Sequence, residues 1–96
     1  MVKLPVPLSF DWDTGNIEKS WGKHKVYHKE AEEVFFDKPL KVFEDTRHSA
    51  RETRLVAYGS NSSNRKLTLV FTIRKQKIRI ISARDQSKKE RRVYET

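Results

Sequence analysis

Alternation of apolar and polar residues in the second half of the chain predicts a run of β-strands. The clearest strand runs from Arg65 to Ile73, because side chains along a strand point alternately to its two faces. A second runs from Lys77 to Arg84, and the tight connection between the two predicts a hairpin. Two earlier strands are expected over Leu40–Glu44 and Thr53–Gly59, followed by a loop rich in Ser and Asn.

The same alternation assigns the two faces of this sheet. The apolar face would carry Leu55, Ala57, Leu67, Leu69, Phe71, Ile73, Ile78 and Ile80. If neighbouring strands pair in register, Arg54 and Arg79 lie on the open face, with the ring of Tyr58 nearby. An arginine in an apolar strand is either a solvated side chain of an open sheet face or part of an anion site.

The first part of the chain predicts one short strand and two helices. Phe10–Trp12 alternates apolar and polar residues, and Asp13 or Thr14 can cap a helix over about Gly15–His24. A second helix is expected over His28–Phe36, where apolar residues form a stripe along one side. The last strand runs into a basic C-terminal helix.

The elements follow one another in the order β-α-α-β-β-β-β-α. Strands joined by short loops pair antiparallel, so this order predicts an α+β fold with a mainly antiparallel sheet and helices on one face. The chain has 96 residues, and we expect residues 1–96 to form a single domain.

Lysine and arginine outnumber aspartate and glutamate by 21 to 13, which gives a formal net charge of +8. This excess indicates a polyanionic partner: nucleic acid, an acidic protein or an anionic membrane surface. The chain has no cysteine, no long apolar run and no apolar region near its start that would suit a signal peptide. We therefore expect a cytoplasmic protein without disulfides.

No metal-binding, phosphate-binding or nucleophilic motif stands out. His24, His28 and His48 are apart in sequence, and the expected helix break separates the first two, so surface histidines are the favoured interpretation. The three glycines form no phosphate loop. We expect no metal and no other cofactor.

RNA cleavage is compatible with what remains, because the ribose 2′-hydroxyl can attack its own phosphate without a metal. The protein must then align the chain and stabilise charge on the phosphate, and arginine suits the second task. Tyr58 or Trp12 could stack on an unpaired base. The candidates for a general acid or base are Lys23, His24, His48, Glu90 and Tyr94. Composition alone does not establish cleavage, because a basic sheet followed by a basic helix is more often a binding surface than a catalyst.

Short motifs run in a fixed order through nearly the whole chain from Phe10 onward. They are Phe10-Asp11-Trp12-Asp13, Lys23-His24, Glu30-Ala31, Val34-Phe35, His48-Ser49, Arg54 five residues before Gly59, and RIISAR at Arg79 to Arg84 followed by Glu90-Arg91 and Tyr94. In this order and spacing they resemble the BrnT family of bacterial toxins.

The resemblance implies a RelE-like fold and a ribonuclease that blocks translation as the toxin of a type II toxin–antitoxin system. It implies a BrnA-type ribbon-helix-helix antitoxin as partner, operator DNA contacted only through that antitoxin, and no membrane. Together with the face assignment, it leads us to expect two sets of site residues. The catalytic set is Arg54, Arg79, His24 and Lys23, and the RNA-binding set is Tyr58, Arg84, Lys88, Arg91 and Arg92.

Four positions depart from the family pattern. A frequent Gly is Lys25, a frequent Asn is Ser20, a frequent Glu is Thr53, and a frequent Lys falls at Asn16. Such departures could reduce activity or change specificity. A non-catalytic nucleic-acid-binding module, or a protein kept only for binding its antitoxin, therefore stays open beside the enzyme.

Several of the expected site residues also have a structural explanation. Arg84 could fix the corner between the last strand and the last helix. Lys23 and His24 could favour the dipole at the end of their helix. Glu90 and Tyr94, four residues apart, could pack the last helix back on the sheet.

Overall fold

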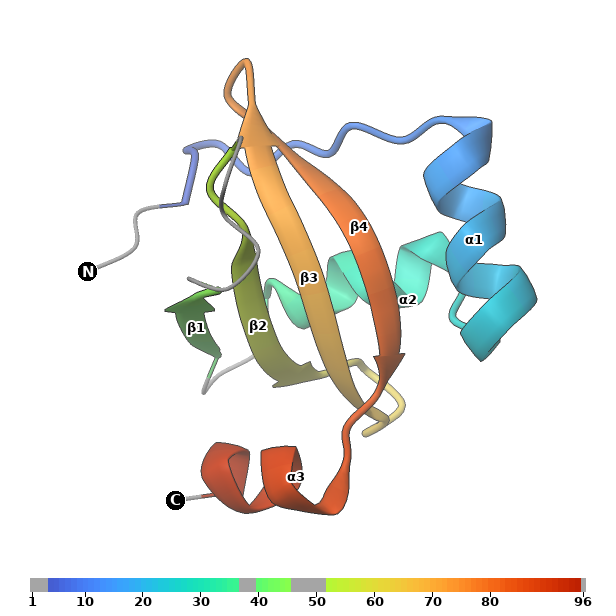
Figure 1. Cartoon of the computed structure of the whole chain (residues 1–96), viewed down its shortest axis with the longest axis vertical. Coiled ribbons are helices and arrows are strands. Elements are labelled where there is room, and N and C mark those ends of the chain that lie inside the picture. The colour runs from blue at the N-terminus through green and yellow to red at the C-terminus, as the bar shows by residue number, and fades with distance from the viewer. Residues whose placement is uncertain (1–3, 37–39, 46–51, 96) are drawn as a thin grey trace.

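The computed structural model of the chain describes residues 4–36, 40–45 and 52–95. In this part, three helices and one four-stranded antiparallel sheet form an α+β fold, as predicted (Figure 1). The elements are α1 (Thr14–His24), α2 (His28–Val34), β1 (Lys41–Glu44), β2 (Leu55–Ser60), β3 (Lys66–Arg74), β4 (Lys77–Asp85) and α3 (Lys88–Glu95). No helix among the described residues is both long and apolar enough to cross a membrane.

The four strands lie side by side in chain order, and each pairs antiparallel with the next. Val56 lies opposite Val70 and Thr72 lies opposite Arg79, so the register assumed from the sequence is confirmed at these positions. The predicted hairpin between β3 and β4 is also present. Its turn, Lys75-Gln76, has φ of 50° and 65°, because a two-residue hairpin turn needs positive φ at both positions to match the strand twist.

The expected first strand at Phe10–Trp12 is wrong, so the observed order is α-α-β-β-β-β-α. This segment makes one parallel bridge, Phe10 to Ile78, along the edge of β4. The backbone N–H of Asp11 donates to the carbonyl of Ile78 at 2.8 Å. Pairing ends there because Asp13 is already the N-cap of α1 and accepts a hydrogen bond from the Asn16 amide at 3.0 Å.

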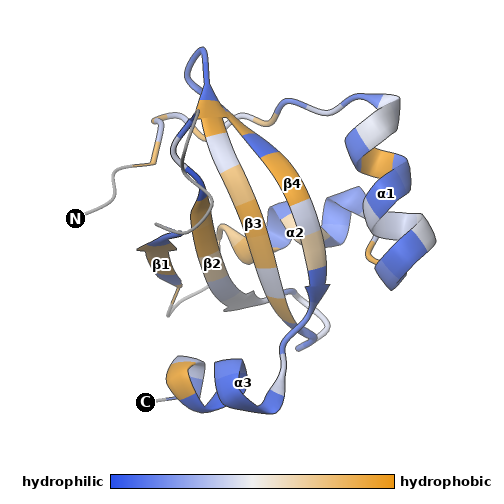
Figure 2. Cartoon of the chain, viewed as in Figure 1, coloured by the Kyte–Doolittle hydropathy of each residue, from blue (hydrophilic) through white to orange (hydrophobic). Residues whose placement is uncertain are grey.

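The core lies between the sheet and helices α1 and α2. Leu67, Leu69, Phe71 and Ile78 are fully buried on this face, which is the apolar face predicted from alternation. Figure 2 shows hydrophobic residues along β2 to β4, while α3 and the hairpin tip are mostly hydrophilic. The helix α2 packs so closely on β2 that a Cβ on Gly59 would lie 2.7 Å from Cγ1 of Val34, so Gly59 is required there.

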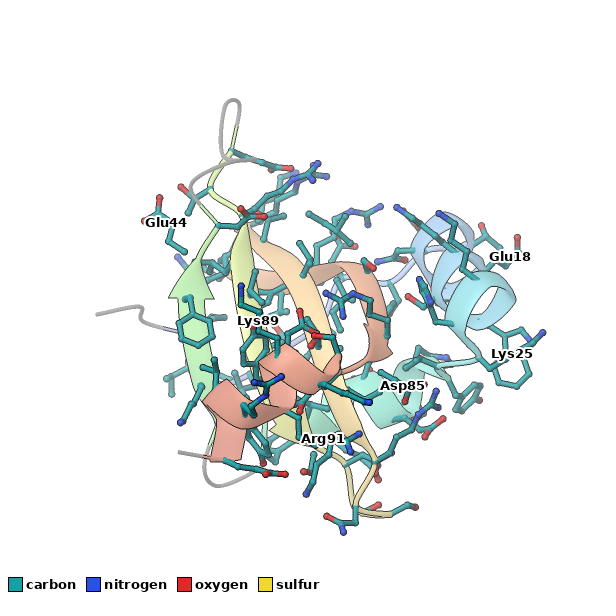
Figure 3. The ribbon with its side chains drawn as sticks, turned by 60° about the horizontal axis from the view of Figure 1, so that its bottom comes forward. Glu18, Lys25, Glu44, Asp85, Lys89 and Arg91 are labelled. Carbon is teal, nitrogen blue, oxygen red and sulfur yellow. The ribbon has the colours of Figure 1, made fainter. Side chains whose placement is uncertain are left out.

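The expectation that all helices cover one face is wrong for α3. Figure 1 shows α2 behind the strands, whereas α3, seen in Figure 3 from the lower end of the sheet, contacts outward-facing side chains of β2 and β3. The Tyr94 hydroxyl lies 3.2 Å from the Ser60 hydroxyl, and Thr68 donates to Glu90 at 3.0 Å. Outward-facing basic residues leave α3 few apolar side chains, so these polar contacts hold it over one end of the open face.

Candidate functional site

A groove of about 580 Å³ lies on the open face of the sheet, between α1 and α3. Its floor is formed by the outward-facing residues of β2, β3 and β4, and its rim carries charged side chains of both signs. The lining residues are Lys19, Asp45, Arg54, Val56, Tyr58, Thr68, Val70, Ile81, Ser82, Arg84 and Glu90. Three of the predicted site residues, Arg54, Tyr58 and Arg84, therefore come together here.

Arg84 owes its place in the groove to an irregularity in β4. Arg79 and Arg84 are five residues apart, so strict alternation would put them on opposite faces. The register shifts between Val70 and Phe71, whose partners are Ser82 and Ile80, and Ile81 is the extra residue. As a result both arginines lie opposite open-face threonines, Arg79 opposite Thr72 and Arg84 opposite Thr68.

Glu90 of α3 fixes the guanidinium of Arg84. The two groups form a pair of hydrogen bonds of 2.6 and 2.7 Å, and Thr68 donates a third to the same carboxylate. The backbone N–H of Ser87 donates to Glu90 as well, which starts α3 with a capping box. The hydrogen bonds from Arg84 lower the pKa of Glu90 from 4.5 to about 2, so it stays a carboxylate at neutral pH.

Tyr58 lies opposite Thr68 on the neighbouring strand, with its ring packed edge-on against Phe43 at 5.0 Å between centroids. Burial, followed by the negative charge of Glu90, raises the pKa of the Tyr58 phenol, while Arg84 acts in the other direction. The phenol therefore keeps its proton at neutral pH. In the groove it can donate a hydrogen bond to an anion.

Arg79 faces the same side of the sheet, but its guanidinium reaches the edge of β4 instead of the groove. It donates to Asp13 at 2.8 Å and lies 3.6 Å from Asp11. Asp13 is the N-cap of α1, so Arg79 joins β4 to the start of that helix. These contacts give Arg79 a structural role at the edge of the sheet, outside the groove, and mutation of Arg79 tests the catalytic role expected from the sequence.

Lys23 and His24 lie in the last turn of α1 and do not line the groove. Lys23 is exposed, and the carbonyl of His24 accepts a hydrogen bond from Arg65 at 3.2 Å. The sequence interpretation missed this arginine, which also donates to the Lys25 carbonyl and pairs with Asp85 at 2.7 Å. Arg65 thus joins the end of α1 to the end of β4. No sequence pattern signalled this, because the contact spans about 40 residues of chain.

The basic residues of α3 point away from the sheet. Lys88, Arg91 and Arg92 are exposed, and none of them lines the groove. These side chains can extend a positive surface beyond the groove. Their contact with RNA stays a prediction. His48 lies outside the described residues.

Lys19 and Ser82 were also missed as groove residues. Lys19 sits on α1, whose polar side the sequence showed without indicating which residues would face the sheet edge. Ser82 follows the extra residue Ile81, so its face could be assigned only once the irregularity in β4 was known. The adjacent pair Ile80-Ile81 was the one available hint, because two successive isoleucines break strict alternation.

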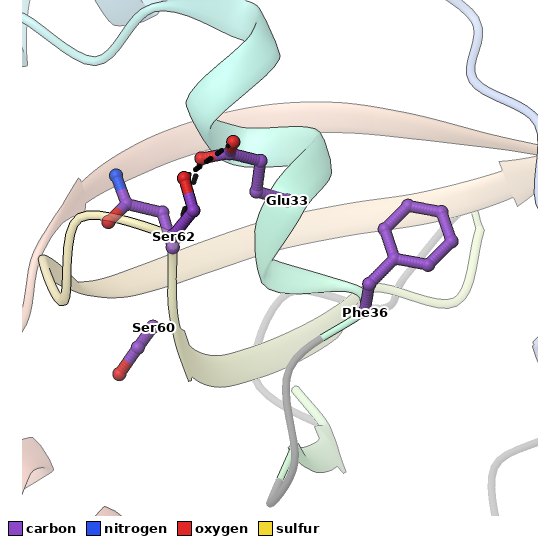
Figure 4. A pocket seen from close by; sticks show the side chains of 5 residues that line it. Glu33, Phe36, Ser60 and Ser62 are labelled. Carbon is purple, nitrogen blue, oxygen red and sulfur yellow. Dashed lines mark hydrogen bonds between the residues drawn. The ribbon is translucent and has the colours of Figure 1, made fainter.

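A second hollow, of about 290 Å³, lies between the end of α2 and the loop after β2. Figure 4 shows it, with the Ser62 hydroxyl bonded to the carboxylate of Glu33 at 2.8 Å. The backbone N–H of Ser62 donates to the same carboxylate. These contacts hold the loop against the helix. They give Glu33 and Ser62 a structural role that needs no ligand.

Within the described residues, no three histidine, cysteine or acidic side chains gather as a metal site would require. The groove offers arginine and lysine charges, a protonated phenol, a hydroxyl and carboxylates. Such a set can bind a phosphate and stabilise additional negative charge on it.

Comparison of the sequence with known protein families shows to which class this protein belongs. Residues 12–90 match the family model described as the ribonuclease toxin, BrnT, of type II toxin–antitoxin systems. The match runs from the segment before α1 to Glu90 in α3, which is most of the chain. The protein is therefore a ribonuclease toxin of a type II toxin–antitoxin system, with an RNA target and a protein antitoxin. It belongs to the BrnT family. No match is found among curated proteins.

Proposed function

We propose that this toxin is a metal-independent endoribonuclease and that the groove on the open face of the sheet is its active site. The observation that carries the proposal is the convergence of Arg54, Tyr58 and Arg84 in one groove of a BrnT-family chain. The groove also has apolar floor residues from β2 and β3, on which a ribose or base can rest.

Arginine provides the charge that phosphate chemistry requires. In the proposed reaction the 2′-hydroxyl gives its proton to solvent water and attacks the adjacent phosphorus, the bond to the 5′-oxygen of the next nucleotide breaks and that oxygen takes up a proton, and a 2′,3′-cyclic phosphate forms. Arg84 is oriented by Glu90 before RNA arrives, and such preorganisation stabilises the pentacovalent phosphate. Arg54 lines the same groove and provides a second positive charge.

Protonation of the departing 5′-oxygen is assigned to a protonated side chain of the groove. Arginine does not give up its proton readily, and the pKa of Glu90, about 2, makes its carboxylate a weak base at neutral pH. Tyr58 is protonated and can hydrogen-bond to a phosphate oxygen or protonate the departing 5′-oxygen. Lys19 can assist in the same role from α1.

The cellular consequences follow from this chemistry. Cleavage of RNA in the cytoplasm inhibits translation, and a BrnA-like ribbon-helix-helix antitoxin neutralises the toxin by binding it. In this proposal, operator DNA is contacted through that antitoxin. The RelE-like character of the fold belongs to the same proposal.

The test is cleavage of a mixed-sequence RNA by the purified, antitoxin-free protein in EDTA. We expect fragments with 2′,3′-cyclic phosphate and 5′-hydroxyl ends, identified by mass spectrometry. A matched RNA with a single 2′-deoxynucleotide at the preferred site should resist cleavage there. Cleavage that EDTA abolishes, or cleavage of the deoxy substrate, would contradict the proposed mechanism.

One alternative has specific support. Net charge of +8 and the exposed lysines and arginines of α3 also suit a module that binds nucleic acid without cutting it. This alternative predicts salt-sensitive RNA binding with no cleavage of free RNA and none in a ribosome-containing assay.

A further inference from the structure

An apolar pocket of about 340 Å³ lies at the junction of α1 and α2, away from the groove. It is lined by Ile17, Glu18, Trp21, Tyr27 and His28. Trp21 and Tyr27 are each 50% exposed, which is unusual for such large side chains. The rings of Tyr27 and His28 are 4.5 Å apart between centroids, and the ring of Trp21 lines the same pocket.

Lysines lie near these rings, together with the carboxylate of Glu18. The ammonium of Lys25 lies 5.2 Å from the centroid of Trp21, and Lys23 and Lys29 are exposed on the neighbouring turns of α1 and α2. Figure 3 shows Glu18 and Lys25 projecting from the side of α1 that faces away from the sheet. Flat apolar rings beside lysines are the arrangement by which proteins hold single-stranded RNA: the base stacks and the phosphate pairs with the cation.

The pocket and the groove lie on two flanks of the same helix. Glu18 lines the pocket and Lys19, the next residue, lines the groove. A helix with its side chains is only about 10–12 Å across, so a short single-stranded segment can lie in the groove and reach the pocket. Lys23, one turn after Lys19, lies on the same side of α1 as Lys19.

We propose that this pocket binds an unpaired nucleobase of the RNA substrate, next to the nucleotides held in the groove. The inference rests on the proposed function and adds a specificity site to it. Trp21 and Tyr27 stack on the base, and Lys25 pairs with its phosphate. Glu18 selects guanine, because the Watson–Crick edge of guanine has two adjacent N–H donors that one carboxylate can accept together.

The experiment is a binding titration that does not depend on cleavage. Fluorescence anisotropy follows the protein against labelled 2′-O-methyl oligonucleotides, which lack the attacking hydroxyl, at one fixed salt concentration. One oligonucleotide is all uridine and its partner contains a single guanine. The variants are Trp21→Ala and Glu18→Gln, with Phe36→Ala as the control because Phe36 is 67% exposed and lines a different hollow.

We expect the guanine oligonucleotide to bind more tightly than the uridine one. Trp21→Ala should weaken its binding about 5- to 100-fold, the range for loss of one stacked base. Glu18→Gln should remove the preference for guanine and leave uridine binding unchanged. Phe36→Ala should bind both oligonucleotides like the wild type.

Wild-type affinity in Trp21→Ala would overturn the inference. So would weaker antitoxin binding by Trp21→Ala with unchanged RNA binding, which would make the pocket part of a protein interface. The proposed function fails separately: a wild type that binds RNA through Trp21 yet cleaves no RNA would keep the pocket and remove the ribonuclease groove.

Discussion

Lys25 ends α1 in a conformation that its side chain disfavours. Its φ of 54° and ψ of 38° lie in the left-handed region, where a Cβ costs roughly 1–2 kcal/mol. This is also the position where the family resemblance leads one to expect glycine, the usual residue after a helix end. The structure thus gives a physical meaning to that departure: it concerns helix termination and lies outside the groove.

Lys25→Gly should raise the free energy of unfolding by about 0.5–1 kcal/mol, because glycine adopts positive φ without strain. Urea denaturation at pH 7 measures this change. Lys25→Ala is the matched control, since it also removes the ammonium beside Trp21 but keeps the Cβ and should give no gain. Equal gains in both variants would assign the effect to the lysine charge instead of the backbone.

Candidate site residues could be predicted from sequence where strict alternation holds. Arg54 directly precedes β2 and Tyr58 lies in it, and the extra residue in β4 does not affect this part of the chain. Both residues line the groove on the face that alternation assigned to them. Arg79 also lies on the predicted face, but the direction of its guanidinium depends on Asp11 and Asp13, about 66 residues earlier. Side-chain direction is decided by such distant partners, which a local pattern does not contain.

At the scale of elements, α3 is held by a polar anchor. Glu90 receives hydrogen bonds from Arg84, Thr68 and the Ser87 backbone. The anchor orients Arg84 and positions the helix at the same time. Stability of the C-terminal part of the fold and geometry of the groove are therefore coupled through one carboxylate.

A carboxyl whose pKa is lower in the folded than in the unfolded state stabilises the fold while it is ionised. For Glu90 this contribution is complete above about pH 4.5 and is lost as the pH falls toward about 2. Glu90→Gln should therefore lower the free energy of unfolding at pH 7 by on the order of 3 kcal/mol. Below about pH 2 the difference from wild type should largely vanish.

Urea denaturation at pH 7, 4.5 and 2.5 tests this expectation. Asp13 and Asp85 also have lowered pKa values, but they titrate in both proteins, so the difference isolates Glu90. Glu44→Gln removes an exposed carboxylate as a control. If the free energies of unfolding of the wild type and of Glu90→Gln differed by the same amount from pH 7 to 2.5, the ionised Glu90 carboxylate would not be what stabilises the fold.

Element boundaries show the same limit of local patterns. The strands over Leu40–Glu44 and Lys77–Arg84 were predicted to within one residue, because hydrophobic alternation and the turn fix their extent. The second helix was predicted to Phe36 but ends at Val34. The segment Phe10–Trp12 has the composition of a strand, yet only Phe10 pairs, because a helix cap two residues later redirects the chain.

At the scale of the whole molecule, positive charge lies in the groove, along α3 and beside the pocket between α1 and α2. Arg54 and Arg84 line the groove, and the exposed lysines and arginines of α3 lie beyond its rim. The α+β class followed from the sequence, but the side of the sheet covered by α3 did not. That choice depends on Arg84 reaching the open face, which in turn depends on the extra residue in β4.

The most direct test of the active site compares cleavage rates of one RNA in EDTA by Arg54→Ala and Arg74→Ala. Arg74 is a matched control, because it lies on the adjacent strand end, outside the groove, paired with Glu52 at 2.7 Å. Arg79→Ala is measured beside them, with circular dichroism to confirm that each variant is folded.

We expect Arg54→Ala to lower the cleavage rate by about 100-fold or more, the usual effect of removing one group that stabilises the transition state. Arg74→Ala and folded Arg79→Ala should cleave within about threefold of wild type, since neither guanidinium lines the groove. A wild-type rate in Arg54→Ala, or a large loss in folded Arg79→Ala, would contradict the placement of the active site in this groove.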